Sequence, residues 1–332
     1  MKPLIKKLVE SYGPSGSEDQ IREMIRAEIK GLTDYVSVDP LGNLIAVIKK
    51  KSKSGKKVML AAHMDEIGVI VSHIDARGFA RFTNIGGVSA LTCVGGRVRF
   101  ANGTVGVIGI EKRENPGNMP TLDQLFIDVG ATSADDCPIK VGEAAGFYRP
   151  FEEVGNRLVA KSMDDRIGCA ILIETLRTLK RTPHEVQFAF TVQEEVGTRG
   201  AGPASFGLEP DIAIAVDVTT TGDTPKAQRM SVMLGKGAAI KVRDGGMLSD
   251  PRVVALLEQR ATEGKIANQR EVLEGGTTDA RAIQVTRAGV PAGCISVPCR
   301  HIHTPSEMVD LRDVQACVNL LTYTLERPID LD

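Results

Sequence analysis

Acidic and histidine side chains follow three apolar runs that have the pattern of buried β-strands. His63 and Asp65 come after KVMLAA, Glu194 and Glu195 after FAFTVQ, and Asp217 directly after DIAIAV. The carboxyl ends of the strands in an open α/β sheet meet at one crevice, so we expect these side chains to converge there. Carboxylates and imidazoles gathered in one crevice are groups that can bind a divalent metal ion.

Two further segments bring the same residue types to this crevice. Asp164 and Asp165 begin a predicted helix beside it, and His301 and His303 lie two residues apart in a turn after GCISVP. Taken singly, an H-x-D pair, a helix-capping aspartate or a solvated glutamate pair would explain each element. Together, three or more carboxylates would repel one another and raise their pKa values unless a cation lay between them. The combination predicts a metal site that suits zinc or cobalt.

The elements that must position these residues alternate between strands and helices, with one interruption. Short β-like runs broken by glycine fill residues 68–156, whereas α/β patterns lie on both sides of that segment. We therefore expect an α/β fold with a mixed, mostly parallel sheet flanked by helices, into which a small β-rich domain is inserted. The predicted catalytic domain comprises residues 1–66 and 158–332, and the predicted insert comprises residues 67–157.

Local patterns give finer expectations. Ser17 and Gln20 fit a capping box at the start of one helix that runs toward Leu32, and Ser249 fits the N-cap of another. The segment 49–57, KKKSKSGKK, holds six lysines between two strand-like runs. In a chain without neighbouring aromatic residues, this segment favours a solvated hairpin turn over a nucleic-acid or lipid patch.

Composition and charge exclude several classes of protein. The 332 residues are 42% hydrophobic and 25% charged, which is typical of a globular chain of about two domains. The net charge of −1 and the absence of tryptophan provide neither an electrostatic field nor stacking platforms for nucleic acid. No signal-peptide core or membrane-length apolar run occurs, so we expect a cytoplasmic protein without a membrane partner. The six cysteines, without a C-x-x-C pair, predict buried reduced thiols.

Six motifs stand in an order that resembles metallopeptidase family forty-two, the deblocking, glutamyl and tetrahedral aminopeptidases. They are AAHMDEIG, KSMDDRIGCA, VQEEVGTRGA, AIAVDVT, GGTTDA and RHIHTPSEM, and they extend over essentially the whole chain. The resemblance implies a zinc-exopeptidase-like catalytic domain with a PDZ-like insert used for dimerisation and assembly. It also implies peptide substrates with a free N-terminus, and homo-oligomers that are dimers or tetrahedral dodecamers.

The same resemblance implies two divalent metal ions per subunit, zinc or cobalt, with manganese as a further possibility. His63 and Asp217 would bind one ion, and Glu195 and His303 would bind the other. Asp164 would bridge both ions.

Further roles are implied for the residues beside these ligands. Glu194 matches the general base that takes a proton from the attacking water, and Asp65 matches the acid that orients His63. His301 stands where family members usually carry an aromatic residue, and we expect a wall residue of the site rather than an extra ligand. The histidines that match no motif, and are expected to be structural, are His73 and His184.

Other functions remain open as alternatives. A dinuclear deacylase or carboxypeptidase of the same fold would use the same ligands. An endoglucanase would need only paired carboxylates, which leaves His63, Asp217 and His303 unexplained. A non-catalytic peptide-binding scaffold would leave Glu194 without a role. The full set of motifs favours the aminopeptidase.

Overall fold

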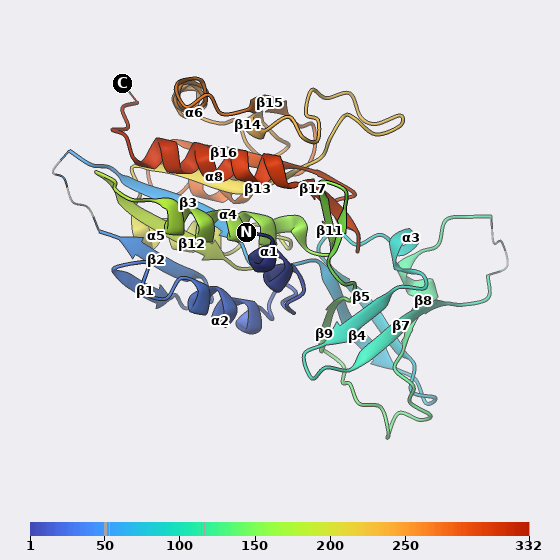
Figure 1. Cartoon of the computed structure of the whole chain (residues 1–332). Coiled ribbons are helices and arrows are strands. Elements are labelled where there is room, and N and C mark those ends of the chain that lie inside the picture. The colour runs from blue at the N-terminus through green and yellow to red at the C-terminus, as the bar shows by residue number, and fades with distance from the viewer. Residues whose placement is uncertain (50–51, 53, 114, 116, 332) are drawn as a thin grey trace.

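A large mixed β-sheet and a separate small barrel make up the computed structural model of the protein, which describes residues 1–49, 52, 54–113, 115 and 117–331. Helices flank the large sheet, and the barrel lies at one end of the molecule (Figure 1). Both chain ends belong to the large-sheet body, and the barrel is formed by the segment between Gly68 and Phe147. The predicted mixed α/β sheet flanked by helices is therefore confirmed.

The centre of the large sheet consists of four parallel strands in the order β12, β3, β13 and β16. Their bounds are β12 (Glu185–Thr191), β3 (Lys57–His63), β13 (Ile212–Thr219) and β16 (Ala292–Arg300). Parallel pairing places Thr191 at the end of β12 beside His63 at the end of β3. The carboxyl ends of these strands therefore meet at one edge, as the apolar runs predicted.

Antiparallel strands extend the sheet on both sides of this centre. They are β1 (Tyr35–Val38) and β2 (Leu44–Ile48) beyond β12, and β17 (Glu307–Asp310), β11 (Arg157–Ala160) and β10 (Glu152–Val154) beyond β16. In addition, β14 (Ala238–Arg243) pairs antiparallel with β16, and β15 (Asn268–Val272) pairs parallel with β14. Parallel pairing is thus limited to the four central strands and the β14–β15 pair.

The connection between β2 and β3 differs from the predicted hairpin. Val186 of β12 pairs with Ile48 of β2 on one side and with Val58 of β3 on the other, so β12 separates the two strands. The strands β2 and β3 therefore do not form a hairpin, and the hairpin prediction for segment 49–57 is wrong. Residues 50, 51 and 53 of this segment lie outside the described residues.

Helices cover both faces of the large sheet. They are α1 (Lys2–Val9), α2 (Asp19–Glu28), α4 (Met163–Thr178), α5 (Ala201–Leu208), α6 (Pro251–Glu263), α7 (Asp279–Gln284) and α8 (Leu311–Leu325). Successive strand residues point to opposite faces, so Leu60 joins one hydrophobic core and Ala61 joins another. The first core packs against α1, α2, α4, α6 and α8, and the second against α5 and α7. Burial on both faces explains why the central strands read as continuous apolar runs.

Neither of the two predicted helix caps forms. No side-chain cap closes α2, whose N-cap is Glu18, because the Glu18 carboxylate accepts hydrogen bonds from the backbone of Gly16 and Gln193 instead. The helix ends at Glu28 and not near Leu32. Asp250 caps α6, because the Ser249 hydroxyl donates to the backbone of β14. The capping roles predicted for Ser17 and Ser249 are therefore wrong.

The barrel closes on itself through six antiparallel strands in the order β4, β5, β8, β7, β6 and β9. Their bounds are β4 (Gly68–Ile74), β5 (Ala80–Ile85), β6 (Arg97–Phe100), β7 (Val105–Ile110), β8 (Leu125–Asp128) and β9 (Ala144–Phe147), with α3 (Ala90–Cys93) and the short 3-10 helix η1 (Leu122–Gln124) between them. Val69, Phe82 and Ile127 contribute to a hydrophobic core of its own. Gly68 of β4 pairs with Gly146 of β9, so the chain enters and leaves the barrel at adjacent positions.

Cysteine and membrane expectations concern the whole chain. All six cysteines are free thiols and five of them are buried, as predicted. Within the described ranges, none of the helices has the length and apolar character needed to cross a membrane.

Candidate metal centre

Three strand ends, one helix start and one turn bring the predicted site residues together. His63 is the last residue of β3, Glu194 and Glu195 follow β12, and Asp217 lies near the end of β13. Asp164 stands in the first turn of α4, and His303 lies in the turn between β16 and β17. The structure therefore places these six residues at the carboxyl edge of the central strands.

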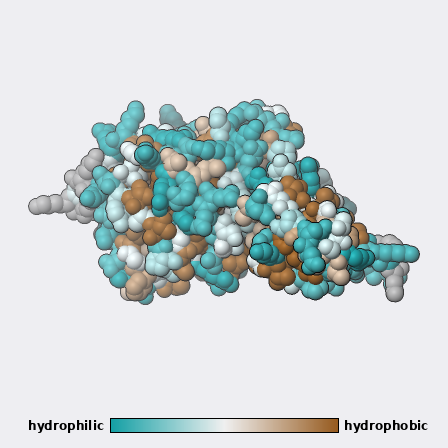
Figure 2. Space-filling view, turned by 90° about the horizontal axis from the view of Figure 1, so that it is seen from below, coloured by the Kyte–Doolittle hydropathy of each residue, from teal (hydrophilic) through white to brown (hydrophobic). Residues whose placement is uncertain are grey.

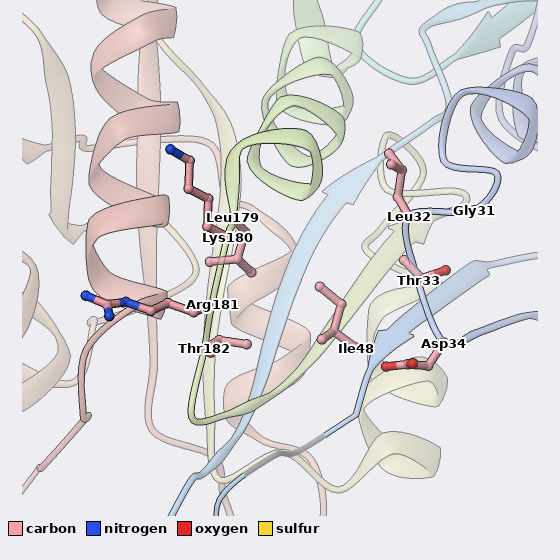
Figure 3. A pocket seen from close by; sticks show the side chains of 9 residues that line it. All are labelled: Gly31, Leu32, Thr33, Asp34, Ile48, Leu179, Lys180, Arg181 and Thr182. Carbon is pink, nitrogen blue, oxygen red and sulfur yellow. The ribbon is translucent and has the colours of Figure 1, made fainter.

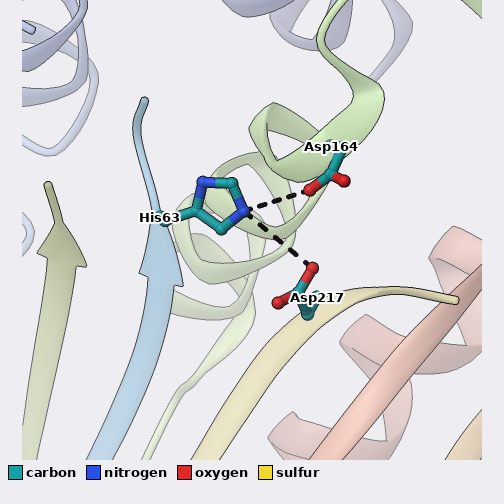
Figure 4. A group of neighbouring side chains, drawn as sticks. All are labelled: His63, Asp164 and Asp217. Atoms are coloured by element: carbon teal, nitrogen blue, oxygen red, sulfur yellow. Dashed lines mark hydrogen bonds and ion pairs between the residues drawn. The ribbon is translucent and has the colours of Figure 1, made fainter. Parts of the chain in front are cut away.

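One group of donor atoms is formed by His63, Asp164 and Asp217 (Figure 4). The Nε2 atom of His63 lies 3.0 Å from Oδ1 of Asp164 and 4.0 Å from Oδ1 of Asp217. All three side chains are buried, and their donor atoms lie within 4.8 Å of one another. Nitrogen and oxygen donors at this spacing are compatible with one divalent ion.

A second group of donor atoms is formed by Asp164, Glu195 and His303. The Nε2 atom of His303 lies 3.2 Å from Oε2 of Glu195 and 3.3 Å from Oδ2 of Asp164. Asp164 therefore belongs to both groups, because Oδ1 faces His63 and Oδ2 faces His303. A carboxylate in this position can serve two ions at once.

The charges in the site favour a bound cation. Burial raises the pKa of Asp217, and the negative charge of Asp164 raises it further. The pKa of Glu195 is raised by the same two causes. Oε1 of Glu195 is buried and has no hydrogen-bond partner among the described residues. Glu195 thus has an oxygen that the described residues do not use, and the residues present fit a pair of metal ions.

Asp164 behaves differently from Asp217 and Glu195. Although burial raises the pKa of Asp164, hydrogen bonds from His303 and His63 outweigh burial and lower it below its usual range. The pKa of His63 is raised in turn, because the contacts with Asp164 and Asp65 outweigh the effect of burial. Asp164 is therefore a carboxylate that the site keeps charged.

Asp65 holds two parts of the site in place. Its carboxylate lies 3.4 Å from Nδ1 of His63, and it accepts hydrogen bonds from the backbone N–H groups of Glu194 and Glu195. The Ser15 hydroxyl donates to it as well, at 2.6 Å. With Nδ1 facing Asp65, the Nε2 atom of His63 is directed at the donor group.

Glu194 faces the site without belonging to either donor group. Its Oε2 atom lies 3.9 Å from Nε2 of His63. Burial raises the pKa of Glu194, and the charge of Asp217 adds to this rise. A carboxylate with a raised pKa can take and return a proton near neutral pH. The adjacent residues Glu194 and Glu195 therefore present carboxylates that can take different roles.

A cavity of about 600 Å³ opens at the two donor groups. Its lining includes Asp164, Glu194, Glu195, Asp217 and His303. His301 is exposed and is not among the lining residues described, so its prediction as a wall residue is wrong. A smaller cavity of about 240 Å³ lies at the opposite end of α4, where the Arg181 side chain points away from Asp34 (Figure 3). It contains neither donor group.

The barrel also contributes to the wall of the site. Gly87, in the turn after β5, lines the large cavity, and a Cβ atom at this position would overlap the ring of His303. At the neighbouring Gly86, whose φ is +71°, a Cβ atom would crowd Glu195. Only glycine fits between the barrel and these two site residues without displacing them.

Left-handed backbone conformations occur in the turns that carry site residues. Ser162 has a φ of 57°, Gln193 has a φ of 56° and His303 has a φ of 60°. Such conformations are costly for residues other than glycine and persist where surrounding contacts hold them. Ser162 lies two residues before Asp164, and Gln193 lies directly before Glu194. His303 is itself a member of the second donor group.

Several residues of the site were not foreseen from the sequence. Glu307 of β17 is buried and accepts hydrogen bonds from the backbone N–H groups of Asp164 and His303. Asp279 at the start of α7 accepts a hydrogen bond from the hydroxyl of Thr191. Asp279 lies in the motif GGTTDA and Glu307 in RHIHTPSEM, but their spacing to the donor residues gives no signal of contact.

The remaining histidines lie away from the site. His184 is buried, accepts a hydrogen bond from the backbone of Lys56 and contacts the carbonyl of Arg327 at 2.8 Å, so its structural role is confirmed. His73 lies on β4 of the barrel.

Comparison with known proteins gives matches along the whole chain. A sequence profile of the M42 glutamyl aminopeptidase family matches residues 42–320. Lysyl aminopeptidase from Pyrococcus furiosus is 35% identical over 344 residues, which cover 98% of each chain.

Solved structures are similar over the same extent. An aminopeptidase from the archaeon Desulfurococcus kamchatkensis has a TM-score of 0.94 and 40% identity, and the match covers 98% of this chain and 94% of that one. The TET1 peptidase of Pyrococcus horikoshii, which is described as assembling into a tetrahedron or a large octahedral shell, has a TM-score of 0.88 and 31% identity. That match covers 98% of both chains.

Proposed function

The chain belongs to the M42 glutamyl aminopeptidase family, and on this basis we propose that it is a dinuclear metallo-aminopeptidase. The observation that carries this proposal is the position of Asp164, whose two oxygens face two separate donor groups. A site for a single ion would have no use for the second group. The substrates would be peptides with a free N-terminus.

The chain offers a nitrogen and two carboxylate oxygens to each ion. His63 and Asp217 would hold one ion, Glu195 and His303 would hold the other, and Asp164 would bridge them. Zinc and cobalt suit this set of donors, and manganese is compatible with the same carboxylates. Two bound metal ions would polarise the peptide carbonyl as Lewis acids and would lower the pKa of the attacking water.

Glu194 would move the proton in this reaction. Its carboxylate lies beside the donor groups without being needed by either of them, and it lines the cavity where a substrate would enter. It would take the proton of the attacking water and pass it to the nitrogen of the leaving peptide. Asp65 would keep Nε2 of His63 directed at the site, because its backbone carbonyl and its carboxylate both face Nδ1 of His63.

The cavity beyond the donor groups would receive the first residue of the peptide. Apolar parts of its lining come from Val218, Leu273 and Ile302. A peptide whose free amine lay at the donor groups would place its first side chain against this lining. The enzyme would then release one residue at a time from the N-terminus.

We further propose that residues 67–157 form an inserted domain used for assembly, and that residues 1–66 and 158–332 form the catalytic domain. The closed barrel with its own core and the adjacent positions of Gly68 and Gly146 support this division. Figure 2 shows hydrophobic surface at the barrel end of the molecule, and exposed apolar side chains there include Leu91, Val105 and Val107. Such a surface suits association with further copies of the chain. We propose dimers and a tetrahedral dodecamer as the assembled states, and the tetrahedron described for the TET1 peptidase supports the latter.

One experiment tests the proposed activity directly. A panel of aminoacyl chromogenic substrates with acidic, aliphatic and basic first residues is assayed on chelator-treated protein and again after zinc, cobalt or manganese is restored. We expect activity only with metal and only on substrates with a free amine. Hydrolysis of N-acetylated peptides alone would favour a deacylase, and peptidase activity that is unaffected by chelation would contradict the metal-dependent mechanism.

A further inference from the structure

Glu307 connects two residues that belong to the candidate metal centre. Its Oε2 atom accepts a hydrogen bond from the backbone N–H of Asp164 at 3.0 Å, and its Oε1 atom accepts one from the backbone N–H of His303 at 2.8 Å. Both oxygens of one carboxylate are therefore engaged by the main chain of two residues that lie far apart in the sequence.

The surroundings of Glu307 give it no other evident partner. The residue is 1% exposed, and in the described part of the chain its carboxylate forms no ion pair with a lysine or an arginine. Burying a carboxylate costs free energy unless hydrogen bonds replace those that it made to water. Here those bonds are made only to the backbone of Asp164 and His303.

Both backbones that Glu307 holds depart from regular structure. His303 has a φ of 60°, in the left-handed region that residues with a Cβ atom disfavour. Asp164 has a φ of −77° and a ψ of 107°, so it is not helical although it stands in the first turn of α4. External hydrogen bonds are the means by which such conformations are kept.

We infer that Glu307 is a positioning residue, which fixes the Asp164 and His303 backbones so that their side chains share one metal site. The inference rests on the proposed metal-dependent function. The side chains of these two residues approach each other at 3.3 Å, between Nε2 of His303 and Oδ2 of Asp164. Glu307 sets the separation of the two main chains from which these side chains extend, and among the described residues its carboxylate is hydrogen-bonded to those two main chains and to neither side chain.

The isosteric variant Glu307→Gln tests this role. A glutamine offers one acceptor oxygen, and its NH₂ group would face the second backbone N–H, so one of the two hydrogen bonds must be lost. Residues that orient metal ligands typically change metal affinity by about 10-fold to 100-fold when they are replaced. We expect a loss of this size for the group of Asp164, Glu195 and His303, and a smaller loss for the group of His63, Asp164 and Asp217.

Asp313 offers a matched control for the general effect of losing such a bond. Its buried carboxylate also accepts two backbone N–H bonds, from Gly235 at 2.6 Å and from Gly237 at 2.7 Å, and it contacts neither donor group. We expect Asp313→Asn and Glu307→Gln both to lower the melting temperature of the protein, but Asp313→Asn should leave metal affinity unchanged.

The measurement is a titration of the chelator-treated proteins with Co²⁺, followed by its visible absorption, together with thermal melting of each protein. The expected result is that only Glu307→Gln weakens the binding of Co²⁺ and alters its absorption. Unchanged Co²⁺ affinity in Glu307→Gln, or an equal loss in Asp313→Asn, would overturn the inference. If Glu307→Gln does not fold, Glu307→Asp, whose shorter side chain cannot reach both N–H groups, carries the same expectation. Failure of the unmodified protein to bind Co²⁺ would instead contradict the proposed function.

Discussion

The ammonium group of Lys161 lies 2.5 Å from Oε2 of Glu66, and both side chains are buried. Lys161 also donates to the carbonyl of Ser11, and Glu66 accepts from the N–H of Gly13. Burial lowers the pKa of Lys161 to about 8. This ion pair joins the segment after α1 to the two chain segments that carry His63 and Asp164.

Removing one partner of this ion pair should strongly destabilise the fold. Lys161→Met keeps the apolar stem but leaves the Glu66 carboxylate buried without its closest cation. Breaking a buried pair in this way typically costs about 3–5 kcal/mol, which urea unfolding would measure. Lys2→Met is the control, because the Lys2–Glu153 pair is exposed and should contribute less than about 1 kcal/mol. Equal effects of the two substitutions would contradict the importance of burial.

Isosteric substitution of two adjacent glutamates should separate metal binding from catalysis. Glu194→Gln removes the proposed proton acceptor and is expected to lower kcat about 10²-fold to 10⁴-fold while both metals stay bound. Glu195→Gln removes a charged oxygen of the second donor group and is expected to weaken metal binding. Metal content and turnover are measured on the same samples. Near-normal turnover of metal-loaded Glu194→Gln would show that another group is the base.

The fit between the barrel and the site can be tested at Gly87. In Gly87→Ala, the added methyl group must displace the His303 ring, so we expect metal affinity at the second donor group to fall about 10-fold or more. Gly202→Ala is the control, because a Cβ atom at this position on α5 meets no atom within 4 Å. Isothermal titration with zinc compares the two variants. Identical titrations would mean that the turn after β5 shifts to accommodate the methyl group while His303 stays in place.

Glu18 should make the stability of the protein depend on pH. Burial raises its pKa from 4.5 to about 7, so the folded state holds a proton that the unfolded state releases between these values. Stability is therefore lost as pH rises from about 4.5 to 7. In Glu18→Gln, the amide oxygen can keep both backbone hydrogen bonds, which go to Oε1 alone, and the titration is removed.

The unfolding free energy of Glu18→Gln minus that of the unmodified protein should therefore increase by up to about 3 kcal/mol as the pH rises from 4.5 to 7. Urea unfolding in the presence of a chelator, at several pH values from 4.5 to 8, measures it. A difference that stays constant over this range would exclude a buried, titrating Glu18.

Excision of the barrel should reduce the size of the assembly. The paired positions of Gly68 and Gly146 allow a short glycine linker to replace residues 69–145 without stretching the large sheet. We expect this shortened chain to fold and to form smaller particles in light scattering than the full chain at the same concentration. An unchanged particle mass would mean that the catalytic domain alone forms the assembly.

The central part of the site could be predicted because its signal is local. Apolar runs mark buried parallel strands, and the residues at their carboxyl ends must meet. His63 and Asp217 could be predicted in this way, because each directly follows an apolar run. The geometry of the donor groups adds what the runs could not provide, namely that Asp164 faces both of them.

Other features depend on partners that are distant in sequence. Val186 separates β2 from β3, yet nothing in the lysine-rich segment between those strands indicates that a later strand will intervene. Ser17 is predicted to cap α2, but the N-cap residue is Glu18. The Glu18 carboxylate accepts a hydrogen bond from the backbone N–H of Gln193, which is distant in sequence. Glu307 and Gly87 become site residues only through the turn that carries His303, which no spacing rule describes.

The adjacency of Gly68 and Gly146 has a consequence for how this protein can change over evolutionary time. Because the barrel begins and ends at one point, loops within it can lengthen, shorten or be exchanged as a cassette while the strand register of the catalytic sheet is unaffected. The turn at Gly86 and Gly87 is the exception, since its length and its glycines are tied to Glu195 and His303. New partners or new shell sizes can therefore arise in the barrel loops without cost to the chemistry, as long as this one turn is inherited intact.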